Sequence, residues 1–416
     1  MGRGKRAGSQ KMNFPSIPRR QFLGLMSAAS GAMLLPGVSR ADVDAAPPPT
    51  TAPASFPLVK FPEKSELMML SDRPPNLEMP LSGFAHDITP NESFFVRWHL
   101  SVIPTSVDLK THRLNVSGEV ETELSLSVED LRTQFEPVSV IAVNQCSGNS
   151  RSLYSPRVMG GQWNNGAIGN AKWTGVRLKD VLAKAKIKAG AVEVVYKGLD
   201  AAPIATVPPF EKSLPIAKAQ DADVMIAYEM NDQPMPMLNG FPIRMIVPGW
   251  YATYWMKALS SIRVVSKPFT GFWMAKAYRI PKNPDCQETP TNLAKDTVPI
   301  NAMTVRSLFF KPAPNERIAA NSTYEVQGLA IDSGKGIKKV EVSDDAGKTW
   351  TEAKLDKELG PFSWRRWRFL WQPPKAGEYA LMARATNVIG QTQTVTQWNH
   401  SGYARNQIEV VRVTVA

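Results

Sequence analysis

The feature that most constrains the fold is a stretch rich in proline and asparagine, IPKNPDCQETPTNLAKDTVPI (residues 280–300). Such residues interrupt regular structure, and here they separate two parts of the chain with different residue patterns. In the first part, strand-like runs such as HRLNVSGEV and VEVVYKGLD alternate with a few helical patterns. Ser127 precedes acidic residues at the start of LSVEDLRTQ and is a candidate helix N-cap. The sequence therefore predicts an α+β domain over residues 81–290.

The second part has the pattern of an all-β domain. The runs STYEVQGLAI, SWRRWRFLWQ, GEYALMARATN and NQIEVVRVTVA recur at short intervals, and DDAG at residues 344–347 is typical of a hairpin turn. This spacing predicts a sandwich of the immunoglobulin type over residues 296–416.

Positive charge is concentrated at the N-terminus. The formal net charge is +12, but residues 1–41 contain seven Lys or Arg and no Asp or Glu, which leaves +5 for the remainder. A surplus this small suits an internal anionic ligand or an acidic partner, and no basic run interleaved with aromatic residues follows. We therefore expect no nucleic acid as a partner.

The basic N-terminus has the form of an export signal. Arg19 and Arg20 precede a modest apolar run, and Ser39-Arg40-Ala41 offers a small-x-small cleavage site. We interpret residues 1–41 as a twin-arginine signal, which predicts a periplasmic protein exported folded. A short membrane anchor is the alternative, although the run is shorter than the roughly 20 residues that a span needs, and no later segment predicts a membrane span. Residues 42–80, which begin DVDAAPPPTTAPASFP, are expected to form an extended arm or linker.

Cysteine usage restricts the possible cofactors. Only Cys146 and Cys286 are present, and the sequence has neither a CxxC pair nor a CxxCH motif. Zinc clusters, iron–sulfur clusters and a haem in this chain are therefore not expected. A disulfide between the two cysteines remains an alternative for an exported chain.

Cys146 occupies a position that favours chemistry. The apolar run 138–143 leads into the polar loop NQCSGNSRS, and Arg151 follows five residues after Cys146. A thiol near a cation and free backbone N–H groups shifts toward thiolate, which ligates metals or attacks as a nucleophile. A cysteine hydrolase would need a histidine base at a recognised spacing, which the four histidines do not provide. An ordinary buried cysteine remains possible at this point.

Three further segments place polar or aromatic residues among apolar ones. In FFVRWHL, Arg97 and His99 alternate with bulky residues and share one face of a strand, where a buried arginine requires an anionic partner. A surface-facing pair is the alternative. The other two segments, residues 227–259 and 271–281, contribute Arg244, Lys257, Trp273 and Tyr278, each of which could also be structural.

Taken together, the motifs NQCSGNSRS, GGQWNNGAIGNAKW, AYEMN, NGFPIR, VPG and WMK occur in this order and resemble the sulfite oxidase family. The resemblance covers roughly residues 85–416 and is closest to the bacterial periplasmic molybdenum sulfite dehydrogenases that lack a fused haem domain. It implies a molybdenum–molybdopterin cofactor, Cys146 as the thiolate ligand of the metal, and a C-terminal domain that forms a homodimer.

The same resemblance assigns roles to individual residues. Arg97, Arg151 and Trp163 match the anion pocket, Tyr278 matches the active-site tyrosine, and His99, Asp200, Arg244 and Lys257 match positions that hold the pterin and its phosphate. Two positions depart from the vertebrate pattern. Asn239 stands in Leu-Asn-Gly where those members have Asp-His-Gly, so one pterin contact is altered in type. Their third pocket arginine follows a Trp-Asn pair, whereas His400 and Ser401 stand here, and Arg405 is the expected replacement.

The resemblance implies oxidation of sulfite to sulfate, with electrons passed to an external periplasmic c-type cytochrome through a transient, electrostatically steered contact. Two related activities are alternatives: a sulfane dehydrogenase subunit of a thiosulfate-oxidising complex, and a periplasmic methionine sulfoxide reductase subunit. A non-enzymatic binding module built on the sandwich is a further alternative from another class.

Overall fold

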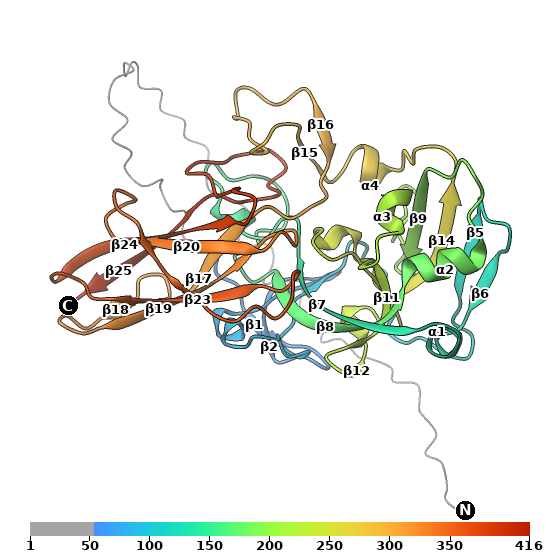
Figure 1. Cartoon of the computed structure of the whole chain (residues 1–416), viewed down its shortest axis with the longest axis horizontal. Coiled ribbons are helices and arrows are strands. Elements are labelled where there is room, and N and C mark those ends of the chain that lie inside the picture. The colour runs from blue at the N-terminus through green and yellow to red at the C-terminus, as the bar shows by residue number, and fades with distance from the viewer. Residues whose placement is uncertain (1–53) are drawn as a thin grey trace, which may run out of the picture.

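The computed structural model describes residues 54–416 (Figure 1). The predicted twin-arginine signal and the first part of the predicted linker lie outside these residues. Figure 1 shows the β-rich C-terminal part on one side and the α+β part on the other, with the N-terminal strands beneath their junction. Across the described range, no helix has both the length and the apolar character needed to cross a bilayer.

The N-terminal segment forms a four-stranded antiparallel sheet in the order β1-β2-β3-β4. Its strands are β1 (Leu58–Lys60), β2 (Glu66–Asp72), β3 (Pro75–Glu78) and β4 (Val96–Arg97). Leu67 and Leu77 are completely buried and pack with Trp98 and Leu238 of the next domain. The predicted extended arm over residues 42–80 is therefore wrong from residue 58 onward. Beyond the Pro/Ala-rich start, apolar side chains on alternate positions bury one face of this sheet.

The α+β domain contains two larger sheets, of strand order β10-β9-β14-β5-β6 and β12-β11-β8-β7, the second extended by β13 beside β11. The strands are β5 (Leu114–Gly118), β6 (Leu124–Leu126), β7 (Pro137–Gln145), β8 (Ile168–Arg177), β9 (Glu193–Gly198), β10 (Glu211–Pro215), β11 (Met225–Met230), β12 (Gln233–Pro234), β13 (Arg244–Ile246) and β14 (Leu259–Val265). Strand β14 pairs parallel with β5, whereas the other pairs in these two sheets are antiparallel.

Helices in this domain are short: α1 (Val128–Gln134), α2 (Leu178–Ala185), α3 (Ile216–Ala219) and α4 (Phe272–Ala275). The expected N-cap is confirmed, because the Ser127 hydroxyl accepts the backbone N–H of Asp130 while the Asp130 carboxylate accepts the N–H of Ser127. Helix α2 begins directly after strand β8, which ends at Arg177.

The C-terminal domain is a two-sheet β-sandwich, as predicted. Its sheets have the orders β17-β19-β23-β22 and β18-β25-β24-β20-β21. The strands are β17 (Arg306–Lys311), β18 (Arg317–Ile318), β19 (Tyr324–Ile331), β20 (Ile337–Ser343), β21 (Thr351–Glu352), β22 (Lys354–Leu355), β23 (Arg365–Trp371), β24 (Gly377–Asn387) and β25 (Glu409–Val415). Val326, Val340, Trp367 and Leu381 fill the space between the sheets. A small pair, β15 (Arg279–Pro281) and β16 (Thr297–Pro299), joins the domains.

The two domains meet along strand β7, which leads to the Cys146 loop. The backbone N–H of Val143 on β7 donates to the carbonyl of Phe362 at 2.8 Å, and the N–H of Ala404 donates to the carbonyl of Ser147 at 3.2 Å. One continuous apolar core includes residues of both domains, such as Trp364 and Ala142. The sandwich therefore supports the loop that carries the cysteine.

Candidate active site

The backbone around Cys146 is held by pairing on both sides. Strands β7 and β8 pair without interruption from Pro137 with Val176 to Gln145 with Ile168. Directly after β7, the N–H of Cys146 donates to the carbonyl of Ala167 at 2.9 Å. Both cysteines are buried free thiols, so the structure excludes the disulfide alternative.

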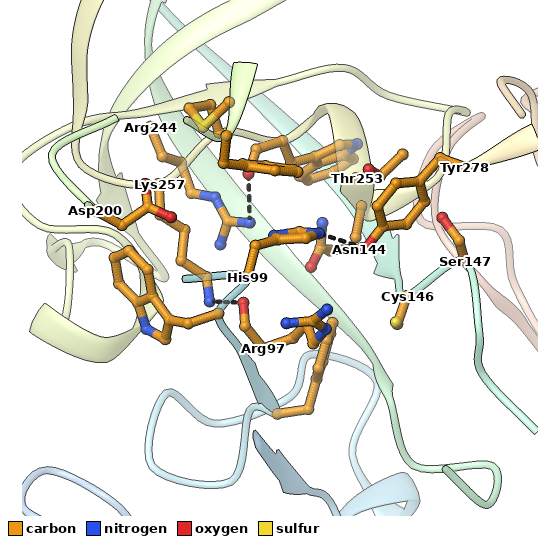
Figure 2. Close-up of a pocket in the computed structure, with 16 residues that line it drawn as sticks. Arg97, His99, Asn144, Cys146, Ser147, Asp200, Arg244, Thr253, Lys257 and Tyr278 are labelled. Atoms are coloured by element: carbon orange, nitrogen blue, oxygen red, sulfur yellow. Dashed lines mark hydrogen bonds between the residues drawn. The ribbon is translucent and has the colours of Figure 1, made fainter. Parts of the chain in front are cut away.

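Cys146 faces a pocket together with most of the predicted site residues. Figure 2 shows their side chains converging from separate segments of the chain. The predicted residues that line this pocket are Arg97, His99, Cys146, Asp200, Arg244, Lys257 and Tyr278. The alternative in which Arg97 and His99 form an outward-facing surface pair is therefore wrong.

The aromatic wall of the pocket is organised around His99 and Tyr278. The Tyr278 hydroxyl lies 2.5 Å from Nε2 of His99, and the imidazole stacks on Phe210 with ring centroids 3.5 Å apart. Tyr278 adopts a φ of +56°, a left-handed conformation that side-chain-bearing residues rarely adopt. Strain of this kind is typical of functional sites, and here it occurs where the ring enters the pocket.

Cations outnumber carboxylates around the pocket. Burial lowers the pKa of Lys257 well below its usual value and that of Arg244 to about 9. Burial likewise lowers the pKa of His99, and the charges of Arg97 and Lys257 lower it further. Asp200 is the acidic residue of the lining, and burial raises its pKa to about 6 against the charge of Lys257. The pocket is therefore suited to an anionic ligand.

Several polar atoms of the lining have no hydrogen-bond partner among the described residues, although they are buried. They are Asn144 Nδ2, Ser147 Oγ, Arg244 Nε and Thr253 Oγ1. Buried polar atoms in folded proteins are nearly always paired, because leaving one unpaired costs about 1–3 kcal/mol. Four such atoms on one cavity indicate that it is built to hold a polar ligand.

Comparison with known proteins identifies the family of this chain. A family model described as "Oxidoreductase molybdopterin binding domain" matches residues 99–273, and "Mo-co oxidoreductase dimerisation domain" matches residues 297–415. The sulfite oxidase of Gallus gallus is 33% identical over 340 residues, which cover 78% of this chain and 72% of the chicken enzyme. The chain belongs to the sulfite oxidase family. The resemblance predicted from its motifs is confirmed.

Two further matches agree with this membership. Mitochondrial sulfite oxidase of Mus musculus is 34% identical over 367 residues, and this alignment covers 84% of the chain but only 66% of the mouse enzyme. The crystal structure of the sulfane dehydrogenase SoxCD from Paracoccus pantotrophus superposes with a TM-score of 0.71 at 23% identity, covering 95% of this chain and 97% of that one. The second match shows that the two chains share a fold.

The residues of this family member fit the molybdopterin cofactor for which its first domain is named. Cys146 offers one thiol, and the part of the chain that the structure describes contains no cluster of three or more His, Cys, Asp or Glu side chains able to hold a metal. A metal ligated by Cys146 therefore needs further ligands from an organic cofactor. Arg244 and Lys257 suit its phosphate, and the unpartnered atoms of Asn144 and Thr253 suit its polar ring.

Two of the residues predicted for the anion pocket lie beside the pocket. Arg151 begins the 3₁₀ turn Arg151–Leu153 and donates to the carbonyls of Gly161 at 3.2 Å and Ser401 at 3.1 Å. It lies close enough to Tyr278 that its charge lowers the phenol pKa, which burial raises. Trp163 is buried in the same core cluster as Cys146.

Asn239 lies outside the pocket lining but contacts Arg244, which belongs to it. It ends the 3₁₀ turn Met237–Asn239, and its carbonyl accepts a hydrogen bond from Arg244 Nη1 at 2.8 Å. Its side-chain oxygen accepts from Nζ of Lys64, and its Nδ2 donates to the carbonyl of Phe95 at 3.2 Å. Asn239 is not among the residues that line the pocket, and in this structure it holds Arg244, which is.

The expectation that Arg405 supplies a third cation to the pocket is not met. Arg405 is buried elsewhere, with Nη1 3.4 Å from the carboxylate of Glu409, which also pairs with the buried Arg306. Because Glu409 already compensates its charge, Arg405 is not available to a substrate in the pocket.

Sequence reasoning also missed several residues around the pocket. Asn144 and Ser147 line it, and their places beside Cys146 in NQCSGNSRS could have indicated them. Lys212 is completely buried on β10, where Nζ donates to the carbonyl of Trp273 at 2.8 Å and lies 5.2 Å from the centre of the Tyr278 ring. Nothing in the local sequence of Lys212 distinguishes it from an exposed lysine.

Proposed function

We propose that this protein oxidises sulfite to sulfate at a molybdenum–molybdopterin centre bound through Cys146. One observation carries the proposal: in a member of the sulfite oxidase family, the free thiol of Cys146 faces the same pocket as Arg97 and the His99–Tyr278 pair. This combination places a soft metal ligand, a substrate cation and a proton-handling pair around one space.

The cofactor would be held by the chain's cations and unpartnered polar atoms. Cys146 would ligate the metal as a thiolate, Arg244 and Lys257 would compensate the phosphate charge, and His99 and Asp200 would contact the pterin. When bound, the molybdenum centre supplies the two-electron oxidation, and the protein supplies orientation and electrostatics.

Arg97 would be the principal cation for substrate. Its guanidinium makes no hydrogen bond or ion pair of its own with another described residue, so all its N–H donors are available. A guanidinium binds two oxygens of a small oxyanion side by side, which suits the sulfite dianion. Arg151 adds positive charge from beside the pocket, and the buried Trp163 helps to exclude water.

Tyr278 would hold or move a proton at its hydroxyl. The lowered pKa of His99 keeps the imidazole neutral at pH 7. In the tautomer that carries its proton on Nε2, the imidazole donates to the phenol oxygen of Tyr278, which leaves the phenol proton free for another acceptor. The pair therefore offers a donor to substrate oxygen without introducing another fixed charge.

We further propose that the protein acts in the periplasm as a homodimer and passes single electrons to an external c-type cytochrome. The twin-arginine motif at Arg19 and Arg20 supports export, and the match of residues 297–415 to a dimerisation domain supports the dimer. The absence of a CxxCH motif from the sequence supports an acceptor outside the chain.

The test uses purified mature protein with its molybdenum content measured. Sulfite should reduce cytochrome c in proportion to bound molybdenum, whereas thiosulfate and methionine sulfoxide should give no turnover. Activity only with sulfur bound to a carrier protein would instead identify a sulfane dehydrogenase. Purified protein that holds no molybdenum and shows no redox activity would instead support a non-enzymatic binding module.

A further inference from the structure

A loop of the C-terminal domain, residues 399–405, reaches back to the edge of the active-site pocket. It leaves the sandwich before β25, and the N–H of Ala404 donates to the carbonyl of Ser147, the neighbour of Cys146. Within this loop, Tyr403 is half-buried and contacts two residues of the proposed substrate site.

The ring of Tyr403 contacts both Tyr278 and Arg151, and its hydroxyl also interacts with the Arg151 side chain. The ring stacks on that of Tyr278, with centroids 5.2 Å apart and planes only 9° from parallel. The guanidinium carbon of Arg151 lies 4.9 Å from the centre of the same ring, within the range of a cation–π interaction. Tyr403 therefore joins the proton-handling residue to a cation of the anion site.

The backbone holds Tyr403 in place through several hydrogen bonds. Its carbonyl accepts from the Tyr154 hydroxyl at 3.0 Å and from Asn399 Nδ2 at 2.9 Å, and its N–H donates to Asn399 Oδ1 at 3.1 Å. Gly402 and Ala404 on either side adopt φ values of +62° and +53°. A Cβ at position 402 would lie 2.6 Å from Nε of Arg151, so the glycine permits the close approach.

This loop occupies the pocket edge where a third arginine was expected. Ser401 stands shortly after Trp398-Asn399, and its carbonyl accepts a hydrogen bond from Arg151. Arg405, the only arginine of the loop, is paired with Glu409 away from the pocket. What the loop contributes at the pocket edge is thus an aromatic ring and a carbonyl that together hold Arg151.

We propose that Tyr403 is a positioning residue that sets the affinity of the active site for oxyanions, by fixing the guanidinium of Arg151 and the ring of Tyr278. The inference rests on the proposed function, since it concerns the substrate site of that reaction. Loss of the ring should remove one support from each neighbour at once, while Arg151 keeps its bonds to the Gly161 and Ser401 carbonyls and Tyr278 keeps its bond to His99. The effect should fall mainly on anion binding, because Tyr403 touches neither the pterin-holding cations nor Cys146 in the contacts above.

The test compares Tyr403→Leu, which keeps apolar volume without the ring face, with Tyr403→Phe, which keeps the ring. Tyr379→Leu, at another half-buried tyrosine of the same domain, is the matched control. For sulfite, KM is measured together with kcat, and kcat is expressed per bound molybdenum. The Kd of sulfate is measured separately by calorimetric titration. The sulfate titration reports on the anion site even if sulfite proves not to be the substrate.

Tyr403→Leu should raise both KM for sulfite and Kd for sulfate about tenfold with a smaller change in kcat, while Tyr403→Phe and Tyr379→Leu stay within about threefold of wild type. An unchanged KM and Kd in the Leu variant would overturn the inference. Equal losses in the Leu and Phe variants would also overturn it, because the hydroxyl and not the ring would then be responsible. Sulfate binding that follows this pattern without any sulfite turnover by wild type would uphold Tyr403 and refute the proposed substrate.

Discussion

The hydroxyl of Tyr278 lies 2.5 Å from Nε2 of His99, although the two residues are 179 positions apart in the sequence. His99 follows strand β4 of the N-terminal sheet, and Tyr278 precedes strand β15, which leads toward the sandwich. The hydrogen bond thus joins the segment that follows the N-terminal sheet to the segment that leads toward the sandwich, and it forms only when both are in place.

Replacing either member of this pair should lower the rate more than the affinity. Tyr278→Phe removes the donor and should lower kcat for sulfite about 10²-fold, the range expected for loss of a positioned proton donor. His99→Phe keeps the stacking on Phe210 but removes the hydrogen bond. Because both variants delete the same interaction, the double variant should be only slightly slower than the slower single variant. A product of the two single effects would show that the residues act independently.

Removal of the Cys146 sulfur should eliminate the metal. A serine hydroxyl is a poor ligand compared with a thiolate, so Cys146→Ser should abolish sulfite turnover and lower the molybdenum content measured by elemental analysis, while far-UV circular dichroism stays unchanged. Cys286→Ser is the matched control, since Cys286 is also a buried free thiol but does not line the pocket. Retention of most of the wild-type rate by Cys146→Ser would remove this residue from the metal site.

Arg97 should act on substrate affinity. Arg97→Met removes a charged donor that has no other partner within residues 54–416, so KM for sulfite should rise roughly 10- to 100-fold with little loss of thermal stability, as expected for about 1.5–3 kcal/mol from a hydrogen bond to a charged group. Arg97→Lys should recover part of the loss, because it restores charge without the paired N–H geometry. Arg263→Met, at an exposed position of β14, is the control. Equal KM values in wild type and Arg97→Met would refute the assignment.

The Cys146 loop and the two-domain architecture could be predicted because their signals are local. An apolar strand runs into a polar loop at Cys146, and the texture of the chain changes beyond residue 280. The N-terminal sheet could not be found in the same way, since its first strand follows a Pro/Ala-rich start and its last strand, β4, which pairs with β3, has only two residues. Arg405 was misassigned because the sequence does not show that Glu409, four residues along, compensates its charge.

Lys64 shows how far a site depends on distant sequence. Nζ of Lys64 donates to the carbonyls of Asn91 at 2.6 Å and Phe94 at 3.1 Å, and to the side chain of Asn239, 175 residues away. Lys64→Met would take this donor from the buried oxygens of Phe94 and Asn239, and should lower the free energy of unfolding by about 1–3 kcal/mol. Because Asn239 holds Arg244, molybdenum content should fall as well. Thermal denaturation and elemental analysis test this against Lys60→Met at an exposed position, and equal melting temperatures would contradict it.

Glu78 should make stability depend on pH. This completely buried residue on β3 accepts hydrogen bonds from the N–H groups of Asn164 at 3.0 Å and Gly166 at 2.8 Å, and burial raises its pKa from 4.5 to about 7. Between these two pH values the folded state binds more protons than the unfolded state, so stability falls as pH rises through this window, by up to about 3 kcal/mol. Glu78→Gln loses one acceptor at every pH but cannot ionise. The melting temperature of wild type minus that of Glu78→Gln should therefore decline from pH 5 to pH 8. Glu66→Gln, at an exposed position of β2, is the matched control and should show no such decline. A difference between wild type and Glu78→Gln that does not vary with pH would show that Glu78 has the same pKa in the folded and unfolded chains.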